Sequence, residues 1–441
     1  MSADRALVFA KFEQRIAKKR IGNRWYNAPA FKMSMLSVQA AQVRIHSHFK
    51  PVETETLSLA QCAGRILAAD ILSSDLPSFD NSSVDGFAVK AQDLTDTTSA
   101  SPRTLRVVAD IPAGFTSDVT IAHGQAARIM TGAPLPKGAD AVIMVEDTDF
   151  NNREAGTPAP REVQAYKTIR VGENVRTRGM DVKTGHKVLF AGHKLRAQDL
   201  GLLAMLGVAN VAIYRKPRVA LLSSGDELTP LEMPLEPGKI RDSNSYVLAP
   251  MIVDSGCDIL PLGIAPDNRQ ALQFLLDQAI GMNADAIISS AGVSVGAFDF
   301  LKEVVESQGR LDFWRVNMRP GKPLAFGEYR GVPFIGLPGN PVSAFVGFEV
   351  FVRGALGRLA GLKTVARTKV QVRLAESVES DGRESYLRVI VEEQDGILSA
   401  KLTGHQGSGN LLSLVQANAL LVIPAGVKSL AIGAQADVWF L

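Results

Sequence analysis

Between residues 217 and 360 the chain alternates buried-strand and amphipathic-helix patterns, and this alternation constrains the fold more than any other feature of the sequence. Four apolar runs, each followed by a helical pattern, are PRVALLSS, DILPLGIAP, ADAIISS and VPFIGLP. Continuous apolar runs are typical of parallel strands that helices cover on both faces. The sequence therefore predicts a three-layer α/β domain over residues 217–360.

The regions on either side of this domain carry β-type patterns. Short runs separated by turn residues predict a small β-rich domain over residues 90–165. A second set predicts a separate β-barrel or sandwich over residues 362–441. The fold class is thus α/β multidomain.

Residues 1–35 form a basic leader. They contain eight Lys or Arg and two acidic residues, a charge of +6, so a net charge of +3 leaves −3 on the remainder. A mildly acidic body is a poor nucleic-acid binder, and we expect no nucleic-acid partner. We expect the leader to be disordered, as an extension or an interaction tail. The alternative is translation from an upstream start, with Met33 or Met35 as the true first residue.

Cysteine and hydropathy patterns exclude several classes of protein. The two cysteines form no CxxC pair, which argues against a disulfide scaffold or a cysteine zinc site and favours a reducing, cytoplasmic setting. No apolar run approaches the ~20 residues that span a bilayer, so no membrane partner is expected. The six histidines show no metal-ligand spacing.

Four loops are predicted at the carboxyl ends of the strands, where open α/β sheets bind their ligands. They are 223–228, 263–268, 289–299 and 336–344, and they contain neither a P-loop nor a GxGxxG motif. Cations and carboxylates that converge on one cleft indicate an anionic ligand with a divalent metal such as Mg²⁺. The candidates are Glu227, Asp267, Asp299, Arg315, Arg319 and Lys322. The alternative is a solvated rim of weak salt bridges.

Residues 292–296 also match the GxSxG pattern of a nucleophile elbow. This pattern would make Ser294 a hydrolase nucleophile. The only histidine downstream is His405, which lies in the separate C-terminal β-rich region and disfavours the hydrolase interpretation.

From about residue 35 to the C-terminus, nine motifs together resemble the MoeA/gephyrin-E family of molybdopterin molybdenumtransferases. In order they are FDNSSVDGFAV, RIMTGAPLPKGADAVIMVEDT, VGENVRTRGMDVKTG, SSGDEL, GKIRDSNSYVL, AGVSVGAFDF, MRPGKPLAFG, GLPGNPVSA and GHQGSGNL. The resemblance implies an elongated domain built from residues 36–89 and 166–216, beside the three domains above. It also implies a homodimer whose active cleft is built from both chains.

The activity implied by the resemblance is the insertion of molybdate into adenylylated molybdopterin, which gives molybdenum cofactor and AMP with the help of Mg²⁺ or a similar divalent cation. Other proteins of molybdenum-cofactor synthesis would be partners. Two alternatives stay open: a scaffold that holds molybdopterin without turnover, and a molybdopterin adenylyltransferase.

The resemblance also assigns site residues. Asp85, Asp181, Glu227, Asp299, Arg315 and Arg319 would be catalytic, and Asp85, Glu227 and Asp299 would bind the metal. The substrate-binding set would be Thr131, Arg176, Ser294, Gly296, Asp267, Lys322, Pro338, Gly339, Pro341, Arg388 and Ser408. Turn geometry is the alternative role for Asp85, Thr131 and the prolines.

The chain departs from the family pattern at four positions. Arg315 and Arg319 stand where Lys is common, Ala297 where an acidic or polar residue is common, and Met180 where Glu is frequent. A planar guanidinium fork does not replace a point charge neutrally.

Overall fold

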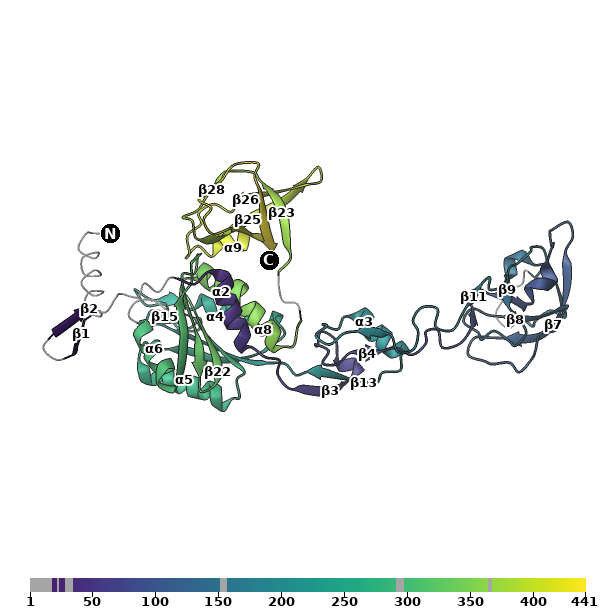
Figure 1. The fold of residues 1–441 in the computed structure, drawn as a ribbon, viewed down its shortest axis with the longest axis horizontal. Coiled ribbons are helices and arrows are strands. Elements are labelled where there is room, and N and C mark those ends of the chain that lie inside the picture. Colours follow the sequence, from purple (N-terminus) through teal and green to yellow (C-terminus); the bar gives the residue numbers. More distant parts are fainter. Residues whose placement is uncertain (1–17, 22–23, 28–34, 151–156, 291–296, 364–366) are drawn as a thin grey trace. The chain divides into compact units, whose positions relative to one another are not determined.

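The computed structural model of the chain describes residues 18–21, 24–27, 35–150, 157–290, 297–363 and 367–441. Its contacts divide the chain into two compact units (Figure 1). Unit 1 comprises Met1–Val52, Lys216–Ala360 and Thr364–Leu441, and unit 2 comprises Glu53–Arg215 with Gly361–Lys363. Each unit is described by itself.

A six-stranded sheet forms the centre of unit 1, in the order β17-β14-β18-β22-β21-β19. Its strands are β14 (Arg218–Ser224), β17 (Asp258–Ala265), β18 (Ala286–Ser290), β19 (Gly309–Arg315), β21 (Pro323–Tyr329) and β22 (Val332–Leu337). The four strands predicted from apolar runs are parallel, as expected.

The far edge of the sheet differs from the prediction of a wholly parallel sheet. Strands β21 and β19 add to it in antiparallel fashion. The connection between them, residues 316–322, is too short for the crossover helix that a parallel pair needs. The segment that was read from the sequence only as a carrier of cations is therefore an edge hairpin.

Helices cover both faces of this sheet (Figure 1). Leu222 of β14 and Ile287 of β18 share a buried core with Leu272 of α5 and Val304 of α6. Helix α4 contacts strands β14 and β17 and helices α7 and α8. Helix α8 also contacts helix α2. The helices are α2 (Val38–His48), α4 (Ser243–Asp254), α5 (Arg269–Gly281), α6 (Ala297–Gln308), α7 (Pro341–Gly347) and α8 (Arg353–Leu359). A π-helical turn, η4 (Phe348–Val352), joins α7 to α8, where the pattern predicts one continuous helix.

Helix α2 belongs to unit 1, whereas we assigned residues 36–89 to the elongated domain. Its apolar face, Val38, Ala41 and Ile45, is buried. The Gln42 side chain donates to the carbonyl of Val350 at 2.9 Å. The structure thus groups residues up to Val52 with the α/β domain.

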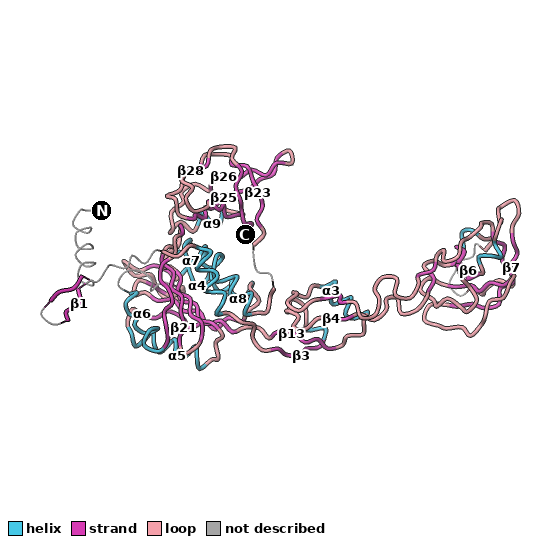
Figure 2. Tube along the Cα trace, in the orientation of Figure 1, coloured by secondary structure: helices cyan, strands magenta, loops and turns pink. Residues whose placement is uncertain are grey.

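Residues 367–441 form a closed five-stranded β-barrel, in the order β25-β26-β23-β29-β27 with β27 paired back to β25. The barrel strands are β23 (Lys369–Leu374), β25 (Glu384–Gln394), β26 (Ile397–Leu402), β27 (Ala419–Ile423) and β29 (Gln435–Phe440). Figure 2 shows that strands and loops make up most of this region. The short strands β24 (Val378–Glu379) and β28 (Ser429–Leu430) pair with each other, and helix α9 (Leu412–Gln416) contacts β25. One buried core, including Val372, Leu387 and Val438, fills the barrel.

A five-stranded sheet, β10-β7-β8-β6-β9, dominates one part of unit 2. Its strands are β6 (Gly86–Val89), β7 (Arg103–Ile111), β8 (Gln125–Ile129), β9 (Ala141–Met144) and β10 (Glu162–Ala165), with 3-10 turns η2 (Ala91–Leu94) and η3 (Val145–Asp147). Strand β6 lies inside this sheet, although we predicted the β-rich domain to begin at residue 90. The backbone of Ile143 on β9 leaves no room for a Cβ at Gly86, so the glycine permits this close pairing.

The remainder of unit 2 consists of short antiparallel pairs with helix α3 (Ala197–Met205). The pairs are β3 (Thr54–Ser58) with β13 (Asn210–Tyr214), β4 (Ile71–Leu72) with β12 (Lys187–Leu189), and β5 (Asn81–Ser82) with β11 (Val175–Arg176), and a 3-10 turn, η1 (Leu59–Gln61), follows β3. Segments that precede and follow the five-stranded sheet in the sequence therefore pair with each other.

Part of the leader is a hairpin and not the disordered segment that we expected. Strands β1 (Lys18–Ile21) and β2 (Arg24–Asn27) pair in antiparallel register. Among the helices that the structure describes, none combines the length and the apolar character needed to cross a membrane.

Candidate functional site

Three carboxylates lie together after strands β14 and β17. The backbone N–H of Asp267 donates to Asp226 Oδ1 at 3.1 Å. Burial, and then the negative charges of Asp226 and Glu227, raise the pKa of Asp267. Sequence reasoning found Glu227 and Asp267 but not Asp226. Their mutual repulsion favours a cation at this end of the sheet.

These carboxylates have the donor chemistry that Mg²⁺ prefers, and Asp267 Oδ1 is buried with no hydrogen-bond partner among the described residues. Within the same described ranges, however, no three His, Cys, Asp or Glu side chains form a ready-made metal cluster. Of the three predicted metal ligands, Glu227 lies here, Asp85 lies in unit 2, and the side chain of Asp299 is not described. The residues present fit a metal that also takes ligands from a bound substrate.

Other buried polar groups lie at the same carboxyl ends. Ser224 ends β14, Ser289 lies near the end of β18, and Asn244 lies at the start of α4. Each has a buried side-chain oxygen without a hydrogen-bond partner in the described part of the chain. Strands β15 (Leu228–Thr229) and β16 (Ile240–Arg241), which are parallel to each other, precede this helix start.

The α/β domain and the barrel meet at a seam within unit 1. The two-residue strand β20 (Met318–Arg319) pairs in parallel with β25 of the barrel, so that Arg319 lies beside Ser385. Arg383 donates to the carbonyl of Met318 at 3.1 Å, and the N–H of Val342 donates to the carbonyl of Ser408 at 3.1 Å. Arg319, predicted to be catalytic, and Ser408, predicted to bind substrate, therefore belong to one seam.

Arg388 of β25 is fully buried near this seam. Its Nε donates to Ser413 Oγ at 3.0 Å and its Nη2 to the carbonyl of Gly407 at 3.1 Å. Its Nη1 has no hydrogen-bond partner among the residues that the structure describes. Burial, and then the charge of Arg319, lower the pKa of Arg388 to about 10. A buried guanidinium group with an unused donor has the hydrogen-bonding chemistry that an anion would satisfy.

The other predicted residues of unit 1 lie around the carboxyl ends of the parallel strands of the six-stranded sheet. Arg315 ends β19 and is exposed, and Lys322 is exposed before β21. Pro338 is buried, Gly339 accepts a hydrogen bond from Asn244 Nδ2 at 2.8 Å, and Pro341 is the first residue of α7.

Asp299 lies in the first turn of α6, while Ser294 and Gly296 lie outside the described residues.

Four predicted residues lie in unit 2, as two pairs. Asp85 Oδ1 accepts hydrogen bonds from the N–H and the hydroxyl of Thr131, both at 2.8 Å. Arg176 Nη2 lies 2.5 Å from Asp181 Oδ2. Strand β11, which carries Arg176, pairs with β5 only a few residues before Asp85. The structure thus brings the four residues into one region of unit 2.

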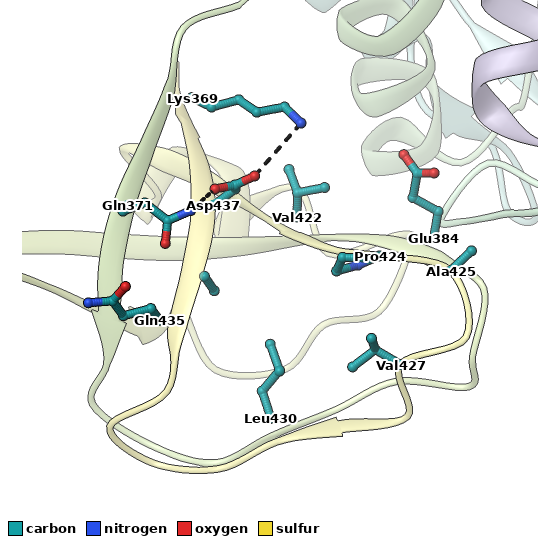
Figure 3. A pocket seen from close by; sticks show the side chains of 11 residues that line it. Lys369, Gln371, Glu384, Val422, Pro424, Ala425, Val427, Leu430, Gln435 and Asp437 are labelled. Carbon is teal, nitrogen blue, oxygen red and sulfur yellow. Dashed lines mark hydrogen bonds and ion pairs between the residues drawn. The ribbon is translucent and has the colours of Figure 1, made fainter.

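Two cavities lie away from these residues. A cavity of about 380 Å³ on the barrel is lined by side chains that include Lys369, Gln371, Glu384 and Asp437 (Figure 3). Lys369 Nζ points toward the carboxylate of Asp437 and lies 3.7 Å from it. A second cavity, of about 460 Å³, lies between α4 and the edge strand β17, with mostly apolar lining. Neither cavity is lined by a predicted site residue.

Sequence reasoning missed Asp226, Ser224, Ser289 and Asn244. Asp226 stands beside Glu227 in a predicted loop, so proximity in sequence was a usable signal. Asn244 follows Asp242 and Ser243 at a helix start, where polar residues are usual caps. No sequence signal separated it from an ordinary capping residue.

Family models match three consecutive regions of the chain. Residues 36–207 match the MoeA N-terminal region (domain I and II), residues 220–358 match a probable molybdopterin binding domain, and residues 371–441 match the MoeA C-terminal region (domain IV).

Individual relatives agree with these matches. The chain is 40% identical over 382 residues to the molybdopterin molybdenumtransferase of Nostoc sp., covering 85% of this chain and 86% of the relative. It is 37% identical over 415 residues to molybdopterin molybdenumtransferase 2 of Mycobacterium tuberculosis, covering 92% and 100%. The crystal structure of the molybdopterin biosynthesis MoeA protein of Pyrococcus horikoshii OT3 superposes with a TM-score of 0.78 at 29% identity, covering 92% and 100%. With residues 36–207, 220–358 and 371–441 matched in this order and relatives at 37–40% identity over most of its length, the chain belongs to the MoeA family.

Proposed function

We propose that the chain is a molybdopterin molybdenumtransferase, which inserts molybdate into adenylylated molybdopterin and releases AMP. Membership of the MoeA family and the names of the relatives support this proposal. The substrate class is a phosphorylated pterin, and the second substrate is a tetrahedral oxyanion.

The buried Arg388 is the observation that carries the proposal. A buried cation is costly unless an anion or several hydrogen bonds compensate it. Arg388 donates to protein groups through Nε and Nη2, and its Nη1 has no partner among the described residues. The positive charge of Arg319 contributes to the lowered pKa of Arg388. A bound dianion would satisfy Nη1 and relieve the repulsion between the two guanidinium groups.

The residues around this pair have separate proposed roles. Arg388 and Arg319, with the segment that carries Ser408, hold molybdate at the seam. Arg315, Lys322 and the loop of Pro338, Gly339 and Pro341 contact the phosphorylated part of the pterin. Charge-assisted hydrogen bonds from Arg to an oxyanion are stronger than neutral ones, which favours this division of labour.

Glu227 and Asp267, with Asp226 beside them, would hold a divalent cation, and Asp299 would complete its protein ligands. When bound, Mg²⁺ supplies charge that brings two anionic substrates together and stabilises the departing phosphate. Asp85 with Thr131, and Arg176 with Asp181, form the second half of the proposed site on unit 2. We propose that a homodimer assembles these halves, in the cytoplasm, where the two buried cysteines stay as free thiols.

The test is to incubate the purified chain with adenylylated molybdopterin and Mg²⁺, with and without molybdate, and to quantify AMP. We expect AMP release that depends on molybdate. Tight pterin binding without molybdate-dependent AMP release would support a binding scaffold. ATP-dependent adenylylation of molybdopterin would support an adenylyltransferase. Either result would overturn the proposal.

A further inference from the structure

Asn244 is held firmly at the carboxyl edge of the sheet. It is the second residue of α4 and is 7% exposed. The helix start is fixed by Asp242, whose carboxylate accepts from the N–H of Ser245 at 3.1 Å and from its hydroxyl at 2.7 Å. The Ser245 hydroxyl in turn lies 3.0 Å from the hydroxyl of Ser223 on β14.

The orientation of the Asn244 amide is determined by its partners. Nδ2 donates to Ser290 Oγ at 2.7 Å and to the carbonyl of Gly339 at 2.8 Å. A carbonyl can only accept, so an exchanged amide would place two oxygens against each other. Both N–H groups of Asn244 are therefore used, and Oδ1 is the atom that remains.

This remaining oxygen is buried, and the described residues give it no hydrogen-bond partner. A buried acceptor without a partner is uncommon in native proteins and calls for an explanation. A rigid, buried acceptor without a partner is suited to one hydrogen-bond donor of a ligand.

The chemistry of this atom selects a class of ligand. An amide oxygen accepts only, so its ligand must donate. A pterin ring presents an exocyclic amino group beside a ring carbonyl. We propose that Asn244 Oδ1 accepts a hydrogen bond from the exocyclic amino group of the pterin ring, and that this contact makes Asn244 a specificity-determining residue. The inference rests on the proposed function.

The test compares two probes that differ at this one group. In 6-hydroxymethyllumazine a carbonyl replaces the 2-amino group of 6-hydroxymethylpterin, so an acceptor would face Asn244 Oδ1. Binding of each probe to the full chain is followed by pteridine fluorescence. We expect the wild type to bind the pterin at least about tenfold more tightly, because a site built around a hydrogen bond rejects the analogue that lacks it.

Asn244→Ala should weaken pterin binding about tenfold and bring the ratio between the two probes close to one. Asn268→Ala is the matched control, since Asn268 also begins a helix at this sheet edge but uses its side-chain oxygen to cap Ala271 at 2.9 Å. We expect this variant to keep the wild-type ratio. Thermal unfolding of both variants checks that they fold.

Three outcomes would overturn the inference. The wild type could bind both probes equally, or Asn244→Ala could weaken both probes by the same factor, which is the result of a structural role. Asn244→Ala could also weaken AMP binding and leave pterin binding unchanged, which would assign the amino group to adenine. All three measurements are of binding. A failure of this inference can therefore be distinguished from a failure of the proposed function, which would appear as absent molybdate-dependent AMP release.

Discussion

Two arginine sites in unit 1, each with one buried charged side chain, are built in opposite ways. Glu349 of η4, with only 1% of its side chain exposed, accepts from Arg353 at 2.7 Å and from Arg367 at 2.7 Å. Arg367 also donates to the carbonyl of Phe440 at 2.9 Å, so this cluster joins the α/β domain to the last strand of the barrel. Arg388 is equally buried but pairs with neutral groups only, within the described residues.

This difference indicates a structural role for the Glu349 cluster and a ligand-binding role for the Arg388 site. The Glu349 cluster pairs its two guanidinium groups with two carboxylates, since Arg353 also lies 3.2 Å from Asp254, and it needs nothing from outside. The Arg388 site leaves positive charge and one donor for a ligand. Variants of the Glu349 cluster should therefore lose stability and keep activity, whereas variants of Arg388 should keep stability and lose activity.

The largest effect is expected from Glu349→Ala, which leaves Arg353 and Arg367 without their shared carboxylate. Breaking a buried ion pair from one side costs about 3–5 kcal/mol. The free energy of unfolding, measured with urea, should fall by that amount. In the folded fraction, the molybdate concentration that gives half-maximal AMP release should stay near the wild-type value. A variant as stable as the wild type would remove the cluster from its structural role.

Arg388→Met should act in the reverse direction. It removes a buried charge that lacks a counter-charge, so we expect unchanged or greater stability. It also removes the main donor for the anion, and we expect kcat/KM for molybdate to fall about 100-fold. Steady-state AMP release at varied molybdate, together with urea unfolding, measures both quantities. Lower stability with normal kcat/KM would show that the comparison is wrong.

Asp199 of unit 2 is a buried carboxylate that, like Glu349 of unit 1, has its own protein partners. Hydrogen bonds from Arg196 and, secondarily, His193 hold the pKa of Asp199 below its usual range, against the opposing effect of burial. A depressed folded pKa stabilises the protein above the unfolded pKa of about 3.9, and this stabilisation is lost as the pH falls. Asp199→Asn should cost about 2 kcal/mol at neutral pH.

The pH dependence supplies the control for this variant. The stability gap between wild type and Asp199→Asn should narrow as the pH drops below about 4. Unfolding by urea at pH 7 and at pH 3.5 measures the gap. A gap that stays constant across this range would mean that the ionised carboxylate does not supply the stabilisation.

The smallest effect is expected from Arg319→Lys, which keeps the charge beside Arg388 but replaces a planar fork with a point charge. We expect kcat/KM for molybdate to fall about tenfold or less, with stability unchanged. Arg319→Ala, assayed in parallel, should lose more. Equal losses in the two variants would show that the charge of Arg319 contributes nothing.

The sequence predicted the parts of the fold that depend on local patterns. The apolar runs that became β14, β17, β18 and β22 were recognisable because buried parallel strands are apolar on both faces. The antiparallel edge of β19 and β21 was missed, since the segment between them was read for its charges. The place of β6 was also missed, because its assignment depends on pairing with the distant β8 and β9.

The sequence allowed the residues of the candidate site to be listed. It did not allow their positions relative to one another to be predicted. Glu227, Asp267 and the loop of Pro338 and Gly339 follow strands, and strand ends meet at one sheet edge. Nothing local relates Arg319 to Arg388, because the pairing of β20 with β25 brings together distant segments. The use of both amide N–H groups of Asn244 likewise depends on Gly339, far along the chain.

The central claim is that Arg388 is held buried for an oxyanion, and calorimetric titration of molybdate into the wild type and Arg388→Met tests it most directly. We expect the wild type to bind molybdate and the folded Arg388→Met variant to bind it at least about 30-fold more weakly, as the loss of a charge-assisted hydrogen bond implies. The same dissociation constant in both proteins would contradict the account.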